Sequence, residues 1–384
     1  MEQAITRSTR STSSSSSNYS THTSTSSSEP ADFIAEAKTL FRIAACGDDS
    51  DLPPGVDAKI VAHHCDELLR TYHQYRTKWL DVAIPFIAEL RPRDLPAEVV
   101  YPFGGSDLVT ALAVFPSADT LTLISLEPAG DVRAIDGTLS GAPPHARGHR
   151  ALVTTAAALT TALALDRANL ARLLSASFSA TKNLGADTRA LLPGEIVFDL
   201  AALAIHGYEP LSLRYFALEP DGSLRYLDTP APNVELTFRR RDDPSAPMKT
   251  MRHIAQNLDD PHVAMAPEVL AHLEAKGAVA TMTKAAHYLL WADDFSRIRD
   301  YLLGHMMWMG SDSTGIPPRF ALPAGFVMET YGAFDAPHAY GRVDARDARD
   351  LRDLFRAHPQ RPLPFSFGYS DLEGHACLIV THKR

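Results

Sequence analysis

The sequence predicts an α/β fold: a Rossmann-like sheet that is mixed but mainly parallel, flanking helices, and an N-terminal helical layer. Two short apolar runs, Val99–Tyr101 and Leu121–Leu126, bracket an apolar helical segment. This is the order of a βαβ unit whose strands are buried on both faces. A glycine turn joins the first run to the helix, as in doubly wound sheets. We therefore expect Val99–Tyr101 to be central in the sheet, with Leu121–Leu126 beside it.

The chain is expected to divide into a tail over residues 1–30, a helical segment over 31–95 and an α/β domain over 96–384. Eighteen of the first 28 residues are Ser or Thr, so the tail buries too little apolar surface to offset its ordering entropy and should be disordered. The first 28 residues contain two arginines, Arg7 and Arg10, and a single acidic residue. This composition also suits a transit peptide, so organelle targeting remains an alternative.

Residues 31–90 are predicted to be helical, with Gly47 ending the first helix. Two sets of apolar or aromatic residues recur there at three- and four-residue steps: Phe33, Ala37, Leu40, Phe41 and Ala44, then Ile60, His64, Leu68, Tyr72 and Tyr75.

The three cysteines, Cys46, Cys65 and Cys377, are far apart and odd in number. They predict neither a disulfide framework nor a zinc site, and they favour a reducing compartment. We therefore expect a cytoplasmic protein, with organelle targeting or export as the alternatives.

The candidate cofactor site begins at the glycine turn. Gly104 and Gly105 allow backbone to approach a ligand, Asp107 lies at the start of the helix, and Glu127 follows the second strand 23 residues after Gly104. An acid there can accept hydrogen bonds from ribose hydroxyls. Because Asp107 would repel a pyrophosphate, a cationic ligand is favoured over a dinucleotide. The alternative is an ordinary turn, with Asp107 capping the helix and Glu127 solvated.

This arrangement resembles the first half of class I S-adenosylmethionine-dependent methyltransferases over about 30 residues. The resemblance implies S-adenosylmethionine as cofactor, with its amino-acid end at Gly104, Gly105 and Asp107 and its ribose at Glu127. It also implies transferase activity, and a sheet that ends in an antiparallel edge.

A second resemblance spans more of the chain. The segments at 101–107 (YPFGGSD), 125–128 (SLEP), 177–182 (SFSATK) and 311–317 (SDSTGIP) resemble a family of uncharacterised bacterial proteins. Many of its members carry export signals, which argues against a cytosolic cofactor, and no such signal is recognised in this sequence. Where that family suggests two adjacent acids, this chain has Asp312 followed by Ser313.

The remaining elements follow from periodicity. Helices are predicted over 152–178, 196–205 and 295–307, a hairpin over 211–227, strands over 234–238, 279–290 and 308–312, and a closing antiparallel hairpin over 363–369 and 376–381.

Two of these segments supply candidate catalytic residues. Lys182 follows an apolar helix and could act as an anion clamp or a base, or be an ordinary surface lysine. Asp312 ends a strand, where ligands bind in open α/β sheets, or it forms an Asx turn with its own backbone.

We predict a small-molecule-binding protein, with a methyltransferase-like enzyme as the leading function. A hydrolase using Asp107, Glu127 and Asp312 as an acid, base or metal cluster is one alternative, and a non-catalytic binding protein is another. A net charge of −9 disfavours nucleic acid as a partner. No apolar run is long enough to span a membrane, and the oligomeric state is left open.

Overall fold

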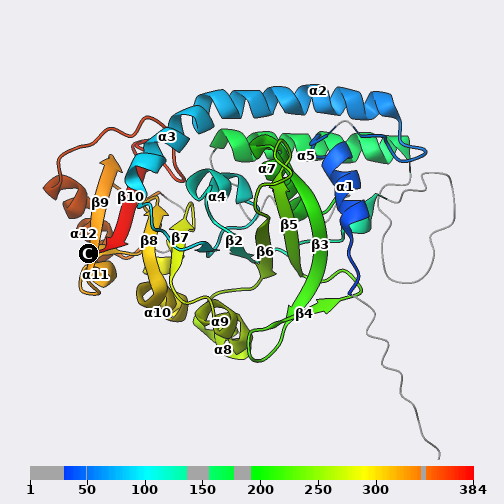
Figure 1. The fold of residues 1–384 in the computed structure, drawn as a ribbon. Helices are drawn as coiled ribbons and strands as arrows, with labels where there is room; N and C mark the ends of the chain where they lie inside the picture. The colour runs from blue at the N-terminus through cyan, green and yellow to red at the C-terminus, as the bar shows by residue number, and fades with distance from the viewer. Residues whose placement is uncertain (1–29, 49, 136–154, 177–191, 339–342) are drawn as a thin grey trace, which may run out of the picture.

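The computed structural model of this chain describes residues 30–48, 50–135, 155–176, 192–338 and 343–384. Nearly all of the predicted tail, and Lys182 with its surrounding motif, lie outside the described residues. The described residues form a mixed α/β fold in which helices pack on both faces of one sheet (Figure 1). No described helix is both long enough and apolar enough to cross a membrane.

The sheet has ten strands in the order β4-β3-β5-β6-β2-β1-β7-β8-β10-β9. They are β1 (Glu98–Tyr101), β2 (Thr120–Ser125), β3 (Tyr208–Leu218), β4 (Leu224–Leu227), β5 (Asn233–Arg240), β6 (Lys249–Ala255), β7 (Val279–Thr283), β8 (Met306–Ser311), β9 (Phe326–Gly332) and β10 (Cys377–Lys383). The five neighbours from β6 to β8 are parallel, and β10 runs antiparallel to both β8 and β9. The predicted pairing of Val99–Tyr101 with the strand at 121–126 is confirmed.

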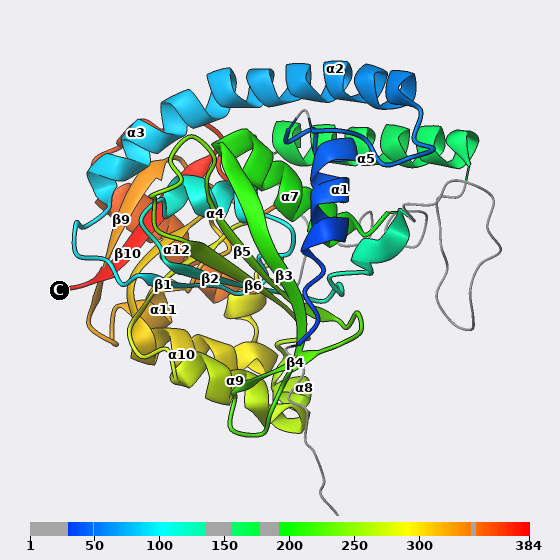
Figure 2. The same cartoon turned by 45° about the vertical axis from the view of Figure 1, so that its right-hand side comes forward.

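One face of the sheet is covered by the helices that precede β3. These are α1 (Ile34–Ile43), α2 (Ala58–Tyr75), α3 (Asp81–Leu90), α4 (Leu108–Val114), α5 (Ala156–Ala176) and α7 (Gly194–His206). The other face is covered by α8 (Asp260–Met265), α9 (Pro267–Glu274), α10 (Ser296–His305), α11 (Pro318–Ala321) and α12 (Ala345–Ala357). Figure 2 shows α2 and α5 running side by side above the sheet, with α8 to α10 below it.

The central strands are buried on both faces, which explains their uninterrupted apolar sequence. Val99 and Leu121 belong to the core beneath α4 and α7, whereas Val100 and Ile124 belong to the core on the α10 side. All four side chains are fully buried. This two-sided burial is the property that the apolar runs predicted.

The N-terminal layer is helical as predicted, but the expectation that the cysteines form no disulfide framework is wrong for Cys46 and Cys65. Cys46, just after α1, forms a disulfide with Cys65 on α2, with 5.5 Å between their Cα atoms. The α2 side chains also hold this segment by hydrogen bonds, His64 Nε2 to the Ala44 carbonyl at 2.9 Å and Tyr72 Oη to the Ala45 carbonyl at 3.1 Å. Helix packing brings together two thiols that are 19 residues apart in sequence.

Two predicted strands differ from the structure. Residues 363–369 form no strand, and the antiparallel partner of β10 is β9, whose sequence had not been singled out. The strand predicted over 279–290 ends at Thr283, because left-handed residues and a 3-10 turn follow it. The predicted β3–β4 hairpin is confirmed, and the helix predicted over 196–205 is α7, which ends at Gly207 with a φ of 74°.

Candidate functional site

A cavity of about 330 Å³ opens where β1, β2, β6 and β7 end. The chain leaves β1 toward β2 on one side, and β7 later pairs with the other side of β1. Such a switch point at the carboxyl ends of parallel strands is where open α/β sheets bind ligands. Gly104, Gly105, Asp107 and Glu127 all line this one cavity.

The glycine turn after β1 has a backbone that other residues do not readily adopt. Gly105 has a φ of +50°, and among the described residues a Cβ there would meet only Ser125 Cβ, at 4.0 Å, while a Cβ on Gly104 would lie 2.6 Å from the Tyr101 ring. Phe103, also in the turn, has a φ of 61° although it is not glycine. The turn therefore exposes backbone to the cavity at Gly105 and packs tightly against β1 at Gly104.

The charge of Asp107 is neutralised within the protein. Its carboxylate lies 2.7 Å from Lys284 Nζ and accepts hydrogen bonds from the Tyr101 hydroxyl at 2.9 Å and the Thr110 hydroxyl at 2.7 Å. Burial and the nearby Asp107 raise the pKa of Tyr101 well above its usual value, so Tyr101 stays a neutral donor. Asp107 was predicted to pair with a cation on the ligand. In the structure its cationic partner is Lys284.

Lys284 is one of the lining residues that sequence reasoning missed, together with Asp259, His287 and Asp294. Its side chain is 3% exposed and lies just after β7, across the switch point from Asp107. The sequence shows it only as one lysine after an apolar run. The signal that could have identified it is that position, because a lysine at the end of a fully buried strand needs an acid to pair with.

Glu127 lies two residues past β2 and is 7% exposed. Its backbone carbonyl accepts hydrogen bonds from the Ser125 hydroxyl at 3.0 Å and His253 Nε2 at 2.9 Å. Burial lowers the pKa of His253 to about 4, so the ring is neutral at pH 7 and carries its proton on Nε2. These two bonds fix the backbone that presents Glu127 to the cavity.

The segment 284–287 forms another wall of the cavity, and its backbone is strained. Ala285, His287 and Tyr288 have φ values of 53°, 48° and 59°. Each non-glycine residue in such a conformation costs about 1–3 kcal/mol and persists only where the surroundings impose it, often at functional sites. His287 is partly buried, with its Nε2 3.3 Å from the Tyr369 hydroxyl.

Asp312 imposes that strained conformation and does not line the cavity. Its fully buried carboxylate accepts N–H hydrogen bonds from Ala285 at 2.8 Å, Tyr369 at 2.8 Å and Thr314 at 2.9 Å. The Thr314 bond is the Asx turn expected as the alternative to catalysis. Burial raises the pKa of Asp312, although these hydrogen bonds lower it. Asp312, directly after β8, thus holds the backbone of three segments together, and a catalytic role for it remains a prediction.

The three acids of the hydrolase alternative do not converge. Asp107 and Glu127 line the cavity, but Asp312 does not, and its carboxylate accepts backbone N–H hydrogen bonds instead. Over the described ranges, no three His, Cys, Asp or Glu residues are grouped so that they could hold a metal ion.

The cavity carries a negative charge with an apolar wall. Among the described residues, Asp107, Glu127, Asp259 and Asp294 line it together with one lysine, Lys284. Lys284 is paired with Asp107, so the acids in the described lining outnumber the basic groups and favour a cation. The apolar wall includes two aromatic rings in edge contact, Phe103 and Phe295, with centroids 5.7 Å apart.

No protein-family model matches this chain, and comparisons with curated proteins and with solved structures found no similar protein.

Proposed function

We propose that the chain binds a small ligand carrying both a cationic group and hydroxyl groups in the cavity at the switch point, and that it acts as a methyltransferase-like enzyme. S-adenosylmethionine is the leading candidate ligand. The observation that carries the proposal is that Gly104, Gly105 and Glu127 line one negatively charged cavity.

The strand order supports this proposal. Taken in chain order, β1, β2, β6, β7, β8 and β9 lie in the sheet as 3-2-1-4-5-6, with β10 inserted between the last two. That is the doubly wound order of nucleotide-binding sheets, apart from the inserted strand. On this side the sheet ends in an antiparallel pair, β10 and the edge strand β9, as the methyltransferase resemblance implies.

The residues present fit such a ligand. Glu127 can accept hydrogen bonds from vicinal ribose hydroxyls, and the open backbone at Gly105 can contact the amino-acid end. Asp259 and Asp294 add negative charge that favours a sulfonium or an ammonium. A cavity of this volume lies within the range of small-molecule sites.

In a methyl-transfer reaction, His287 is the residue of this chain that would act as the base. Burial and the nearby His338 lower the pKa of His287, so its imidazole is neutral at pH 7 and can accept a proton from an acceptor group. Bound S-adenosylmethionine supplies an electrophilic methyl group. Lys284 holds the Asp107 turn in place, and Asp312 holds the segment that carries His287. A catalytic role for Lys182 remains a prediction.

Calorimetric titration of Glu127→Ala tests the binding proposal. The ligands are S-adenosylmethionine, S-adenosylhomocysteine, simple nucleotides, an aminosugar and divalent metals. Losing a charged hydrogen bond costs about 1.5–3 kcal/mol, so we expect adenosyl binding to weaken about 10- to 150-fold. Glu89→Ala, which removes an exposed acid on α3, is the matched control and should bind like the wild type.

The other outcomes assign the alternatives. Metal binding that depends on Asp107 would favour the hydrolase. If an aminosugar binds and adenosyl ligands do not, the cavity still binds a ligand with a cation and hydroxyl groups. That result would contradict the methyltransferase proposal. If the folded protein binds none of these ligands, both the methyltransferase and the hydrolase proposals are contradicted. A protein that binds a macromolecule without catalysis is then favoured.

The Cys46–Cys65 disulfide favours an oxidising compartment, because cytosolic thiols are kept reduced. We therefore infer export or organelle targeting rather than a cytoplasmic location. An exported protein would not meet a cofactor that is confined to the cytosol. The aminosugar is tested for this reason, because it also carries a cationic group and hydroxyl groups. Alkylation of thiols in intact cells before lysis measures the oxidation state; three alkylated cysteines would contradict this inference.

A further inference from the structure

The turn after β1 holds a phenylalanine in a backbone conformation that suits glycine. Two residues of this turn are left-handed, Gly105 with a φ of 50° and Phe103 with a φ of 61°. Glycine adopts such a conformation readily, whereas a residue with a bulky side chain is strained in it. Strain of this kind persists where the surroundings impose it, and it is concentrated at ligand-binding sites. The ring at position 103 therefore needs a reason beyond the shape of the turn.

The Phe103 ring is held against the core on the α10 side of the sheet. It is partly buried and packs on that core. It also makes an edge contact with Phe295, with centroids 5.7 Å apart and ring planes at 73°. Both phenylalanines line the cavity of the candidate site, together with Leu258 and Leu289. A fixed aromatic surface thus forms part of the cavity wall.

Carboxylates line the same cavity as these rings. Asp294 directly precedes Phe295, is exposed, and forms no hydrogen bond or ion pair with the part of the chain that the structure describes. Asp259 accepts hydrogen bonds from the His262 backbone N–H at 2.9 Å and from Asn257 Nδ2 at 2.8 Å. Burial raises the pKa of Asp259, but these hydrogen bonds outweigh burial and keep it below its usual value. Asp259 is therefore ionised at neutral pH.

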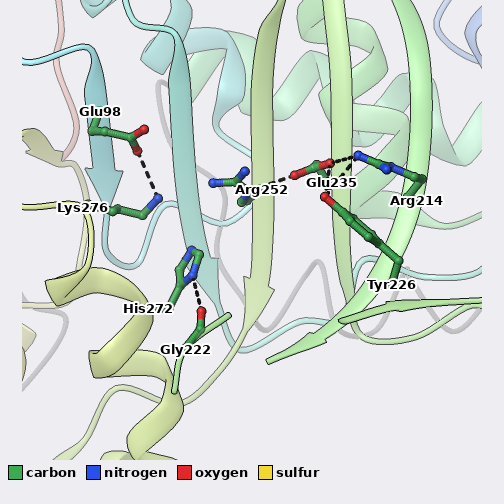
Figure 3. Close-up of polar contacts among 8 residues, drawn as sticks. All are labelled: Glu98, Arg214, Gly222, Tyr226, Glu235, Arg252, His272 and Lys276. Atoms are coloured by element: carbon green, nitrogen blue, oxygen red, sulfur yellow. Dashed lines mark hydrogen bonds and ion pairs between the residues drawn. The ribbon is translucent and has the colours of Figure 1, made fainter. Parts of the chain in front are cut away.

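Acids on β1 and β5, away from the cavity, are neutralised by basic neighbours. Glu235 is paired with Arg214 and Arg252, and Glu98 is paired with Lys276 (Figure 3). In the described lining of the cavity, by contrast, acids outnumber basic groups. The excess of acid is thus a local property of the cavity, and it favours a cation.

An aromatic ring beside carboxylates favours one kind of cation. A primary ammonium is strongly hydrated and has three N–H donors to satisfy, and a phenyl ring offers it no oxygen or nitrogen acceptor. A sulfonium or a quaternary ammonium has no such donors. Its alkyl groups can pack on the ring, and the ring quadrupole attracts its charge, which is how proteins recognise quaternary ammonium ligands.

We propose that Phe103 is the specificity-determining residue of the cavity, and that it selects a sulfonium or a quaternary ammonium over a primary ammonium. Phe103 supplies the surface on which the alkyl groups lie, and Asp259 and Asp294 supply the opposite charge. The inference rests on the proposed function for the place of the ligand, and it adds the chemical class of the cation. An aminosugar, whose cation is a primary ammonium, should bind weakly.

Calorimetric titration of the full chain with S-adenosylmethionine and S-adenosylhomocysteine tests the proposal, because only the first carries a charged sulfur. Phe103→Leu keeps an apolar side chain without a ring and should weaken binding of S-adenosylmethionine about 2- to 30-fold, the range of a cation–π contact. S-adenosylhomocysteine, whose sulfur is neutral, should bind this variant as it binds the wild type. Phe103→Tyr restores a ring and should recover most of the lost affinity.

Choline extends the test to a cation without an adenosyl group. Its comparison ligands are 3,3-dimethylbutan-1-ol, which has the same shape without the charge, and ethanolamine, which has a primary ammonium. We expect choline to bind the wild type more tightly than either of them. Phe103→Leu should weaken the binding of choline and leave that of the neutral alcohol unchanged.

A variant of the charge covers a Phe103→Leu protein that fails to fold. Asp294→Asn should weaken S-adenosylmethionine and choline about 2- to 5-fold, because one partly screened charge is lost, and should spare their neutral analogues. Asp293→Asn is the matched control, since Asp293 is the adjacent exposed acid and does not line the cavity. It should bind every ligand as the wild type does.

The outcomes separate this inference from the proposed function. Choline binding that depends on Phe103, without any adenosyl binding, would support the inference and contradict the methyltransferase. Adenosyl binding that depends on Glu127 but is equal in wild type and Phe103→Leu would support the methyltransferase and overturn the inference. An equal loss for both adenosyl ligands in Phe103→Leu, tighter binding of ethanolamine than of choline, or no binding to the folded wild type would also overturn it.

Discussion

The Asp312 carboxylate accepts N–H groups from segments 27 and 57 residues away, as well as from its own turn. A buried carboxylate is costly unless it is hydrogen-bonded, and several backbone donors can satisfy it. Gly368 must remain a glycine for this contact, because a Cβ there would lie 2.0 Å from Asp312 Oδ2. Asp312 thus fixes the backbone of Ala285, which lines the cavity, without lining the cavity itself.

Asp166 on α5 should make the stability of the protein depend on pH. Burial raises its pKa to about 8, so the folded state binds this proton more tightly than the unfolded state does. The contribution is fully present below the unfolded pKa of about 4 and is lost as pH rises toward 8, by up to about 1.4 kcal/mol per pH unit. Asp166→Asn should flatten the free energy of unfolding between pH 5 and 8, measured by urea denaturation.

An exposed acid provides the comparison for that measurement. Asp353→Asn on α12 changes the same functional group in solvent and should leave the slope with pH as it is in the wild type. An unchanged slope in Asp166→Asn would show that Asp166 is hydrated in the folded protein.

At the scale of elements, the disulfide joins the end of α1 to α2. In the chain-entropy account, closing a loop of 19 residues stabilises the fold by about 3 kcal/mol, because the unfolded chain loses freedom. Reduction, or Cys46→Ser with Cys65→Ser, should lower the free energy of unfolding by about that amount. The double variant should no longer respond to reductant.

Thiol titration of the denatured, unreduced protein is the direct check on the bond. It should find one free thiol, that of Cys377. Three free thiols, with a free energy of unfolding that reductant does not change, would show that the disulfide is absent and contributes nothing to stability.

The elements differ in how far sequence could predict them. Strands buried on both faces, such as β1 and β2, show as continuous apolar runs, and α7 ends at a glycine that adopts φ 74°. The disulfide could not be predicted, because it depends on how α1 packs against α2. β9 was missed because its inward residues alternate with partly exposed ones and resemble many surface segments.

The site shows the same division. Gly104 and Glu127 are marked by local order, strand then turn then acid, and they line the cavity. Lys284 is 177 residues from Asp107, so only the pairing of β1 with β7 brings them together. Asp312 was predicted at the correct strand end, but its orientation depends on the Tyr369 segment. Contacts between distant segments are what a single sequence leaves undetermined.

At the scale of the whole molecule, β10 holds one edge of the sheet together. Ile379 is paired with Ser311 on β8 and with Thr330 on β9. Ile379→Pro removes a ladder hydrogen bond and places a rigid ring inside the sheet, where proline is not tolerated. We expect a loss of at least about 1–3 kcal/mol in the free energy of unfolding, the cost of leaving a buried carbonyl without its donor, measured by urea denaturation.

The matched proline variant is Arg384→Pro, one residue beyond β10 and exposed. It should unfold at the wild-type denaturant concentration. A wild-type midpoint for Ile379→Pro would mean that β10 is dispensable for the fold.

The place of β10 also sets an order of events during synthesis. Within the sheet, β9 pairs with β10 alone, and β8 pairs with β7 and β10. Residues 326–332 therefore leave the ribosome about 50 residues before the strand that they pair with. Until residues 377–383 follow, β8 and β9 have unpaired edges, and exposed edges recruit other chains. The nascent protein is thus most prone to aggregation just before this one strand inserts between its two neighbours.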